Sequence, residues 1–352
     1  MRVQRGARIV AVGLFAALVA AGCSTDASTR AAGAQRGPTT TAASVTVPVS
    51  VPAGTTLRVG DQLDYLKTVL SLAGQDKDFG YTVEYSAFIG GPPMLQAFQA
   101  DALDTGFVGS TPLIFAQAGG QAITAVAGWA SGHGSYGLLV GAGHDDISGW
   151  ADLKGKRVAY QKGTAGEAAL LQALDGVGLG LDDVESVDVP QTQVSSVLQG
   201  GGADAGISIE PLSSLFLLSD PSARQVAEAG ELTDRSSFVI ASDATLRDDA
   251  KSAALADYLA RLVRSFAYLK DRPELIAQAV YVKQYGLPPE RAAQIVEKAG
   301  GIEFLTLPGE TVAAQQRLAD LFVTAGEIPS KIDVASEFDT RFNALVQKEQ
   351  GS

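Results

Sequence analysis

Two short stretches place hydroxyl side chains at the start of an expected helix. Ser110 and Thr111 stand before Pro112, which favours a first helical turn, and Gly163-Thr164-Ala165-Gly166 leads into an expected helix over 167–174. The first N–H groups of a helix lack partners within it and carry the positive end of its dipole. Both stretches can therefore receive an oxyanion such as a sulfonate or carboxylate. Ordinary capping by the hydroxyls is the alternative for each.

Four other side chains are candidate ligand contacts. Gln62 follows the first expected strand and could contact a ligand. The alternative is that it is a solvent-exposed residue in the first turn of a helix. Trp129 and His133 flank the approach to the first expected crossing between the halves, where both could line a binding site. The alternatives are that Trp129 belongs to the core and that His133 is a loop residue. Glu210 precedes Pro211 at a strand end, and its carboxylate repels an anion unless the ligand also carries a cation or donor. A salt bridge within the protein is the alternative for Glu210.

The composition argues against most catalytic and metal chemistry. One cysteine allows no disulfide within the chain and no thiolate zinc cluster, and two histidines make haem and histidine-rich metal sites poor candidates. The chain has no nucleophile elbow, phosphate-binding P-loop or His-Glu-x-x-His motif. A net charge of −12 argues against nucleic acid. We therefore expect no enzyme, no cofactor and no metal.

The elements that must position these residues alternate between strand and helix. Short apolar or alternating runs predict strands, and apolar residues at helical spacing predict the helices between them. Such alternation indicates an α/β architecture with largely parallel sheets. Expected strands cover 57–60, 81–88, 105–108, 123–129, 136–140, 157–160, 184–189, 205–209 and 236–240. Expected helices include 61–73, 94–100, 112–118 and 310–325, and a stripe of Leu255, Leu259, Leu262, Phe266 and Leu269 predicts a helix facing the core.

An internal echo predicts two similar halves. Residues 104–112 (DTGFVGSTP) parallel residues 204–211 (DAGISIEP), and each stretch ends an expected strand with a polar loop and proline. Ligands of open α/β sheets bind outside the carboxyl ends of the strands. Two such edges facing each other would form a cleft. Coincidence is the alternative for so short a match.

The first residues predict export and a lipid anchor. Three arginines within the first eight residues precede an uncharged apolar run over 9–22, and small residues stand before Cys23. This pattern is similar to a lipoprotein signal over 1–22 with lipid on the Cys23 thiol, although Ala20 stands where such signals usually have Leu. A core thiol is the alternative for Cys23.

Residues 23–54 predict a disordered tether. The stretch is rich in small and polar residues and contains no aromatic side chain, so it has little to bury. A flexible chain of this length spans roughly 30 Å. We expect the folded part to be held at that distance from a membrane.

Three ordered motifs carry a family resemblance. The stretches GSTPLIFAQAGG (109–120), DLKGKRVAYQKGT (152–164) and ADAGISIEP (203–211) resemble periplasmic-type substrate-binding proteins. The nearest branch is that of aliphatic sulfonate, taurine and nitrate importers, which also contains thiamine-precursor binders. The similarity covers most of residues 57–300.

The resemblance implies a two-lobed fold of the type II periplasmic-binding-protein kind. Lobe I would hold 57–138 and 237–352, lobe II would hold 139–236, and strands near 136–140 and 236–240 would cross between them. A small solute would bind between the lobes without turnover. The partners would be an ABC permease and its ATPase, and the chain itself would lie at the outer face of the cytoplasmic membrane.

One departure bears on the ligand. Sulfonate-binding relatives often have Trp-Asp-Pro or Trp-Glu-Pro where this chain has Ile209-Glu210-Pro211. A zwitterion such as taurine, or an aminopyrimidine, would suit Glu210 better than a simple anion. A sensing or adhesion lipoprotein of the same fold is a second functional interpretation. Thiamine-pyrimidine synthases share the fold, but their cysteine-rich motif is absent here.

Overall fold

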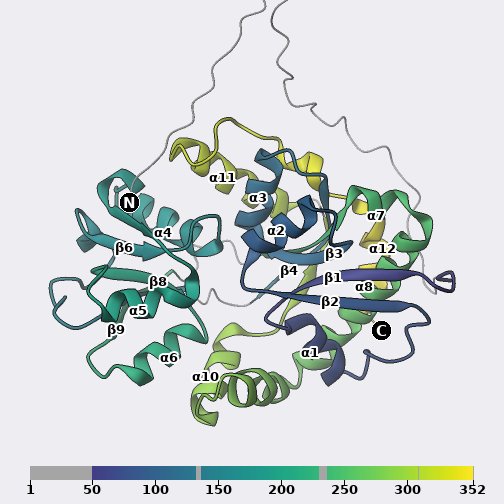
Figure 1. Ribbon diagram of the computed structural model, residues 1–352, viewed down its shortest axis with the longest axis horizontal. Coiled ribbons are helices and arrows are strands. Elements are labelled where there is room, and N and C mark those ends of the chain that lie inside the picture. The colour runs from purple at the N-terminus through teal and green to yellow at the C-terminus, as the bar shows by residue number, and fades with distance from the viewer. Residues whose placement is uncertain (1–49, 132–135, 230–235, 308, 352) are drawn as a thin grey trace, which may run out of the picture. The chain divides into compact units, whose positions relative to one another are not determined.

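The computed structural model describes residues 50–131, 136–229, 236–307 and 309–351 (Figure 1). The predicted signal, Cys23, His133 and nearly all of the predicted tether lie outside these ranges. Within them, no helix is both long and apolar enough to cross a membrane.

The first sheet has six strands in the order β11-β4-β10-β3-β1-β2. The strands β1, β2 and β3 are parallel, whereas β10 runs antiparallel to β3 and β4, and β11 runs antiparallel to β4. The bounds are β1 Thr56–Gln62, β2 Thr82–Phe88, β3 Thr105–Gly109, β4 Ile123–Ala130, β10 Ser236–Ser242 and β11 Glu303–Leu305.

The second sheet has five strands in the order β7-β6-β8-β5-β9. The strands β6, β7 and β8 are parallel, and β5 runs antiparallel to β8 and β9. The bounds are β5 Tyr136–Val140, β6 Arg157–Tyr160, β7 Glu185–Asp188, β8 Ala205–Ile209 and β9 Arg224–Glu228. The α/β expectation is confirmed, with each sheet mixed rather than parallel throughout.

The chain passes from one sheet to the other twice, between β4 and β5 and between β9 and β10. The sequence placed the crossings in the strands 136–140 and 236–240. In the structure, β5 lies wholly in the second sheet and β10 wholly in the first. Each is thus the first strand after a crossing.

Helices accompany both sheets (Figure 1). The 22-residue helix α8 buries the predicted stripe from Leu255 to Leu269 against the first sheet, so that expectation is confirmed. The first helix begins at Tyr65 rather than at residue 61, because Asp61 belongs to β1. The Asp61 carboxylate accepts hydrogen bonds from the N–H groups of Leu66 and Lys67 at the start of that helix. The bounds are α1 Tyr65–Leu72, α2 Gly91–Gln99, α3 Ser110–Ala118, α4 Ala165–Gly176, α5 Val194–Gln199, α6 Leu212–Ser219, α7 Asp243–Arg247, α8 Asp249–Lys270, α9 Pro273–Ile276, α10 Pro289–Ala299, α11 Glu310–Thr324 and α12 Asn343–Gln350, with a π-helix over Ala277–Gln284.

Four clusters of buried apolar residues form the core, and one of them joins the two sheets' helices. Ala168 and Leu171 of α4 belong to the same cluster as Leu113 and Ile114 of α3. The helix α4, which follows β6 of the second sheet, therefore packs against α3, which follows β3 of the first sheet.

Candidate functional site

The structure brings together the two stretches expected to receive an oxyanion. A Cβ built on Gly109, the residue before α3, would lie 3.9 Å from the Cβ of Ala165, the first residue of α4. A Cβ built on Gly163 would lie 3.5 Å from Cγ of Pro92 in α2. Because α3 follows the first sheet and α4 follows the second, the two helix N-termini meet from different sheets.

In the first stretch, one hydroxyl is used and one is not. Ser110 is buried, and its Oγ donates to the carbonyl of Ser236 over 3.1 Å. Thr111 is fully buried, and its Oγ1 finds no hydrogen-bond partner among the described residues. A buried unsatisfied polar group costs about 1–3 kcal/mol. The Thr111 hydroxyl is therefore suited to a ligand or a water.

In the second stretch, Thr164 is an ordinary cap. Its Oγ1 accepts from the N–H of Gly166 at 3.2 Å and donates to the carbonyl of Gln161 at 2.7 Å. Gly166 packs closely, because a Cβ there would come within 3.2 Å of Cε1 of Tyr136 and the ring would have to shift. The Gly166 N–H is thus used by the Thr164 cap, and the first turn of α4 lies close to an aromatic ring.

A buried carboxyl lies at the same end of α4. Glu167 is fully buried, and one of its oxygens accepts the Gly163 N–H at 2.8 Å. Burial raises the pKa of this carboxyl to about 7, against the opposing hydrogen bond from Gly163. The group is thus partly neutral near neutral pH. A neutral carboxyl repels an incoming anion less than a carboxylate does.

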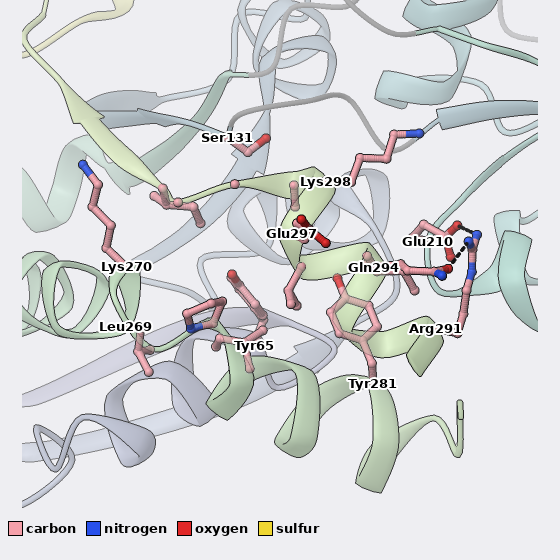
Figure 2. Close-up of a pocket in the computed structure, with 18 of the residues that line it drawn as sticks. Tyr65, Ser131, Glu210, Leu269, Lys270, Tyr281, Arg291, Gln294, Glu297 and Lys298 are labelled. Carbon is pink, nitrogen blue, oxygen red and sulfur yellow. Dashed lines mark hydrogen bonds and ion pairs between the residues drawn. The ribbon is translucent and has the colours of Figure 1, made fainter. Parts of the chain in front are cut away.

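A cavity of about 450 Å³ is lined by residues of both sheets and by α10 (Figure 2). Tyr65 and Ser131 come from the side of the first sheet, and Tyr136 and Glu210 come from the second. Tyr136 also lies beside Gly166, so it connects the cavity to the N-terminus of α4. The size falls within the ~300–1,000 Å³ typical of pockets for organic ligands.

Three tyrosines of the cavity stay protonated at physiological pH. Burial raises the pKa of Tyr136 to about 12. Burial, reinforced by the nearby charge of Glu210, also raises the pKa of Tyr281 to about 12. Burial raises the pKa of Tyr65 as well. These phenols offer neutral aromatic surface and hydrogen-bond donors.

Glu210 lines the cavity but is engaged within the protein. One oxygen accepts from Nη2 of Arg291 at 2.9 Å, and the other accepts from the hydroxyl of Ser214 at 2.5 Å (Figure 2 shows the pair with Arg291). Arg291 Nε also donates to the same hydroxyl at 2.7 Å. In the structure Glu210 therefore forms the salt bridge that was the alternative to ligand binding. Its charge is neutralised by Arg291 of α10.

Of the predicted contacts within the described residues, Glu210 alone lines the cavity, so the residues at the starts of α3 and α4 lie outside the lining, as do Gln62 and Trp129. Gln62 Nε2 donates to the carbonyl of Phe107 at 2.8 Å and ties β1 to β3. Trp129 is only 4% exposed and packs against Phe107, Phe266 and Phe304 with ring centroids 5.5–5.7 Å apart. Its place is thus the core position named as the alternative. His133 lies outside the described residues.

Sequence reasoning found only Glu210 among the lining residues; those it missed include Tyr65, Tyr136, Tyr281 and Arg291. Tyr136 could have been found, because it begins the strand directly after a crossing. The other three lie on helical segments, and nothing in their spacing sets them apart from core or surface positions. In the described part of the chain, no cluster of three or more His, Cys, Asp or Glu could hold a metal ion.

Residues 78–276, more than half of the chain, match the NMT1/THI5-like family, so the chain belongs to that family. The resemblance read from the three motifs is thereby confirmed. The fold is that of the periplasmic binding proteins, as in a Candida albicans protein that is 16% identical over 81% of this chain and 96% of that one, with a TM-score of 0.65.

Relatives with higher identity are binding proteins. The periplasmic aliphatic sulphonate binding protein SsuA from Escherichia coli is 27% identical over 81% of this chain and 92% of that one, with a TM-score of 0.67. The alkanesulfonate-binding protein SsuA from Xanthomonas axonopodis pv. citri, bound to MOPS, is 26% identical over 82% and 99%, with a TM-score of 0.72. The desulfurization enzyme DSZB shares the fold alone, at 15% identity over 84% and 99%, with a TM-score of 0.58.

Proposed function

We propose that this chain is the extracytoplasmic solute-binding component of an ABC importer. It captures a small organic solute that carries an oxyanion, of which a sulfonate is the leading class, and delivers it to a permease without turnover. The relatives named for aliphatic sulfonates support the solute class.

One observation carries this proposal. The N-termini of α3 and α4, which follow different sheets, meet at Gly109 and Ala165, and Tyr136 connects the α4 N-terminus with a cavity lined by both sheets. The helix dipoles, the N–H groups of the first helical turns and the unpartnered Thr111 hydroxyl would supply oxyanion binding without a free cation. Because both halves contribute, the solute favours the arrangement in which they are together, and the two crossings act as the hinge.

The proposal includes export and anchoring. The signal over 1–22, lipid on Cys23 and the tether over 23–54 would hold the folded part at the outer face of the cytoplasmic membrane, near the permease and its ATPase. Lobe I would comprise 57–138 and 237–352, and lobe II 139–236. Membership of β1–β4 in one sheet and β5–β9 in the other supports these boundaries.

The test follows thermal unfolding of residues 24–352 against alkanesulfonates, taurine, nitrate, sulfate and aminopyrimidines. A ligand present at 100 times its dissociation constant adds about 2.7 kcal/mol of stability. We expect a raised midpoint with sulfonates, and a smaller shift in Thr111→Val. The matched control is Thr324→Val, at an exposed helix end. No shift with any compound, after ligand removal by unfolding and refolding, contradicts the proposal and favours the sensing or adhesion role.

A further inference from the structure

The two sheets end in four outer strands within the described residues, and three of these edges are blunted. The strand β11 has only three residues, and β7 has four, with Glu185 and Asp188 at its ends. The strand β9 has Arg224 and Glu228 at its ends, and its register with β5 shifts midway. Short length, charges and bulges keep a sheet edge from pairing with another chain.

The fourth edge, β2, lacks this protection. It has seven residues, no proline and a single charge, Glu84. Its register with β1 runs unbroken from Thr82 to Phe88. A long, regular edge of this kind is a template for a further strand.

The outer side of β2 offers three N–H groups and three carbonyls. The Thr82 N–H donates to the carbonyl of Thr55 over 3.0 Å. The Phe88 carbonyl accepts the N–H of Leu63 over 3.2 Å. The even-numbered residues of β2 therefore direct their backbone groups toward β1, and the odd-numbered residues direct theirs away from the sheet. The outward-facing residues are Val83, Tyr85 and Ala87.

The side chains on the polar face of β2 favour a second copy of the same strand. When two copies run antiparallel with Tyr85 opposite Tyr85, all the outward N–H and carbonyl groups meet. Glu84 of each copy then lies opposite Ser86 of the other, so two hydroxyl–carboxylate contacts form and no like charges meet. Both side chains are exposed, and neither has a hydrogen-bond or ion-pair partner in the described part of the chain. A pair centred on Glu84 would instead oppose two carboxylates.

The same register covers apolar side chains on the other face. Ala87 is exposed, and Ile89, directly after the strand, is 53% exposed. Tyr81 and Val83, at the other end of this face, pack against the core. In the antiparallel pair, Ala87 lies opposite Val83 of the second copy, and Ile89 lies opposite Tyr81. Association would therefore bury apolar surface that one chain leaves in water.

We propose that two copies of this chain associate along β2, in an antiparallel pair centred on Tyr85 that joins their first sheets into one continuous sheet. Each copy contributes one strand, so the interface is small and the dissociation constant should be on the order of 10 µM. The strand contributes no residue to the lining of the cavity between the sheets. The inference is therefore independent of the proposed function.

Sedimentation velocity of residues 24–352, from about 1 to 300 µM, tests the association because this range brackets the expected constant. We expect the mass to rise with concentration toward that of two chains. Hydrogen exchange should show increasing protection of the Val83, Tyr85 and Ala87 amides over the same range. A chain that stays monomeric throughout overturns the proposal and leaves this edge to an extended segment of another protein. A dimer whose β2 amides gain no protection overturns it as well.

Two opposite substitutions at Ser86 test the register. Ser86→Glu places like charges opposite each other twice and should weaken association about tenfold, whereas Ser86→Lys faces Glu84 of the other copy and should tighten it about fivefold. Ser330→Glu and Ser330→Lys, at an exposed serine after α11, are the matched controls and should leave association unchanged. Thermal unfolding checks that every variant is folded. Equal association of the two Ser86 variants overturns the proposed register.

Discussion

The carboxylate of Asp104 accepts hydrogen bonds from both the backbone N–H of Arg58, at 2.8 Å, and its guanidinium, at 2.7 Å. Arg157 holds Asp204 in the same way, at 2.8 and 2.6 Å. Each aspartate stands directly before the strand that pairs with the arginine's own strand, β3 with β1 and β8 with β6. The sequence echo between 104–112 and 204–211 is therefore a structural repeat.

The first prediction concerns this repeated clamp. Asp104 is 1% exposed and also binds Lys251 at 2.7 Å, so Asp104→Asn removes the buried carboxylate charge that both Arg58 and Lys251 face and should cost about 3 kcal/mol of unfolding free energy. Asp204 is more exposed, and Asp204→Asn should cost about 1 kcal/mol. Denaturant titration measures both. Asp101→Asn, on an 81% exposed side chain, is the control and should change stability by less than about 0.5 kcal/mol. Equal costs at all three sites would refute the argument.

The second prediction concerns the ion pair between α10 and Glu210. Arg291→Met should weaken solute binding about tenfold, because Glu210 would lose its partner beside the cavity and the link between α10 and the second sheet would be lost. The affinity of the parent chain should fall as salt is raised, and that of the variant should change less. Arg247→Met, in an exposed pair with Asp243, is the control. An affinity of Arg291→Met equal to that of the parent chain would argue against the link.

The third prediction concerns Glu167. Its pKa of about 7 exceeds the ordinary value, so the unfolded chain loses this proton at lower pH than the folded one. Below about pH 4.5 the Glu167 carboxyl therefore does not reduce the unfolding free energy. The reduction grows to a few kcal/mol as the pH rises to 7 and stays constant at higher pH. Glu167→Gln keeps an oxygen for the Gly163 N–H and should raise the unfolding free energy at pH 8 by about 2 kcal/mol.

The pH profile is the check on that prediction. The difference between Glu167→Gln and the parent chain should shrink to near zero at pH 4.5. A difference that is the same at both pH values would mean that packing, not ionisation, causes it.

The fourth prediction concerns anchoring. Cys23→Ser removes the thiol that would carry lipid, so the chain should move from the membrane fraction to the soluble fraction when expressed in a bacterium that processes lipoproteins. Metabolic labelling with a fatty acid should mark the parent chain and not the variant. Ser24→Ala is the neighbouring control. Labelling of Cys23→Ser would rule out this anchor.

Local patterns predicted most of the fold. The α8 stripe, the strand alternation and the echo each depend on neighbouring residues, and the structure has them in place. The partners of Glu210 and Trp129 depend on long-range packing instead. Arg291 lies 81 residues from Glu210, and the rings around Trp129 come from β3, α8 and β11. The two helix N-termini were predicted because a proline or glycine beside hydroxyls marks a helix start in the chain itself.

The two crossings also set the order in which strand partners become available along the chain. All five strands of the second sheet lie between Tyr136 and Glu228, whereas β3 and β4 of the first sheet pair with β10, which begins at Ser236. A chain that emerges from its N-terminus can complete the second sheet while one edge of β3 and both edges of β4 still lack a partner. The first sheet closes late, through contacts distant in sequence, which are slow to form. Until β10 is added, its apolar β3 and β4 are consequently the strands that most need protection from aggregation.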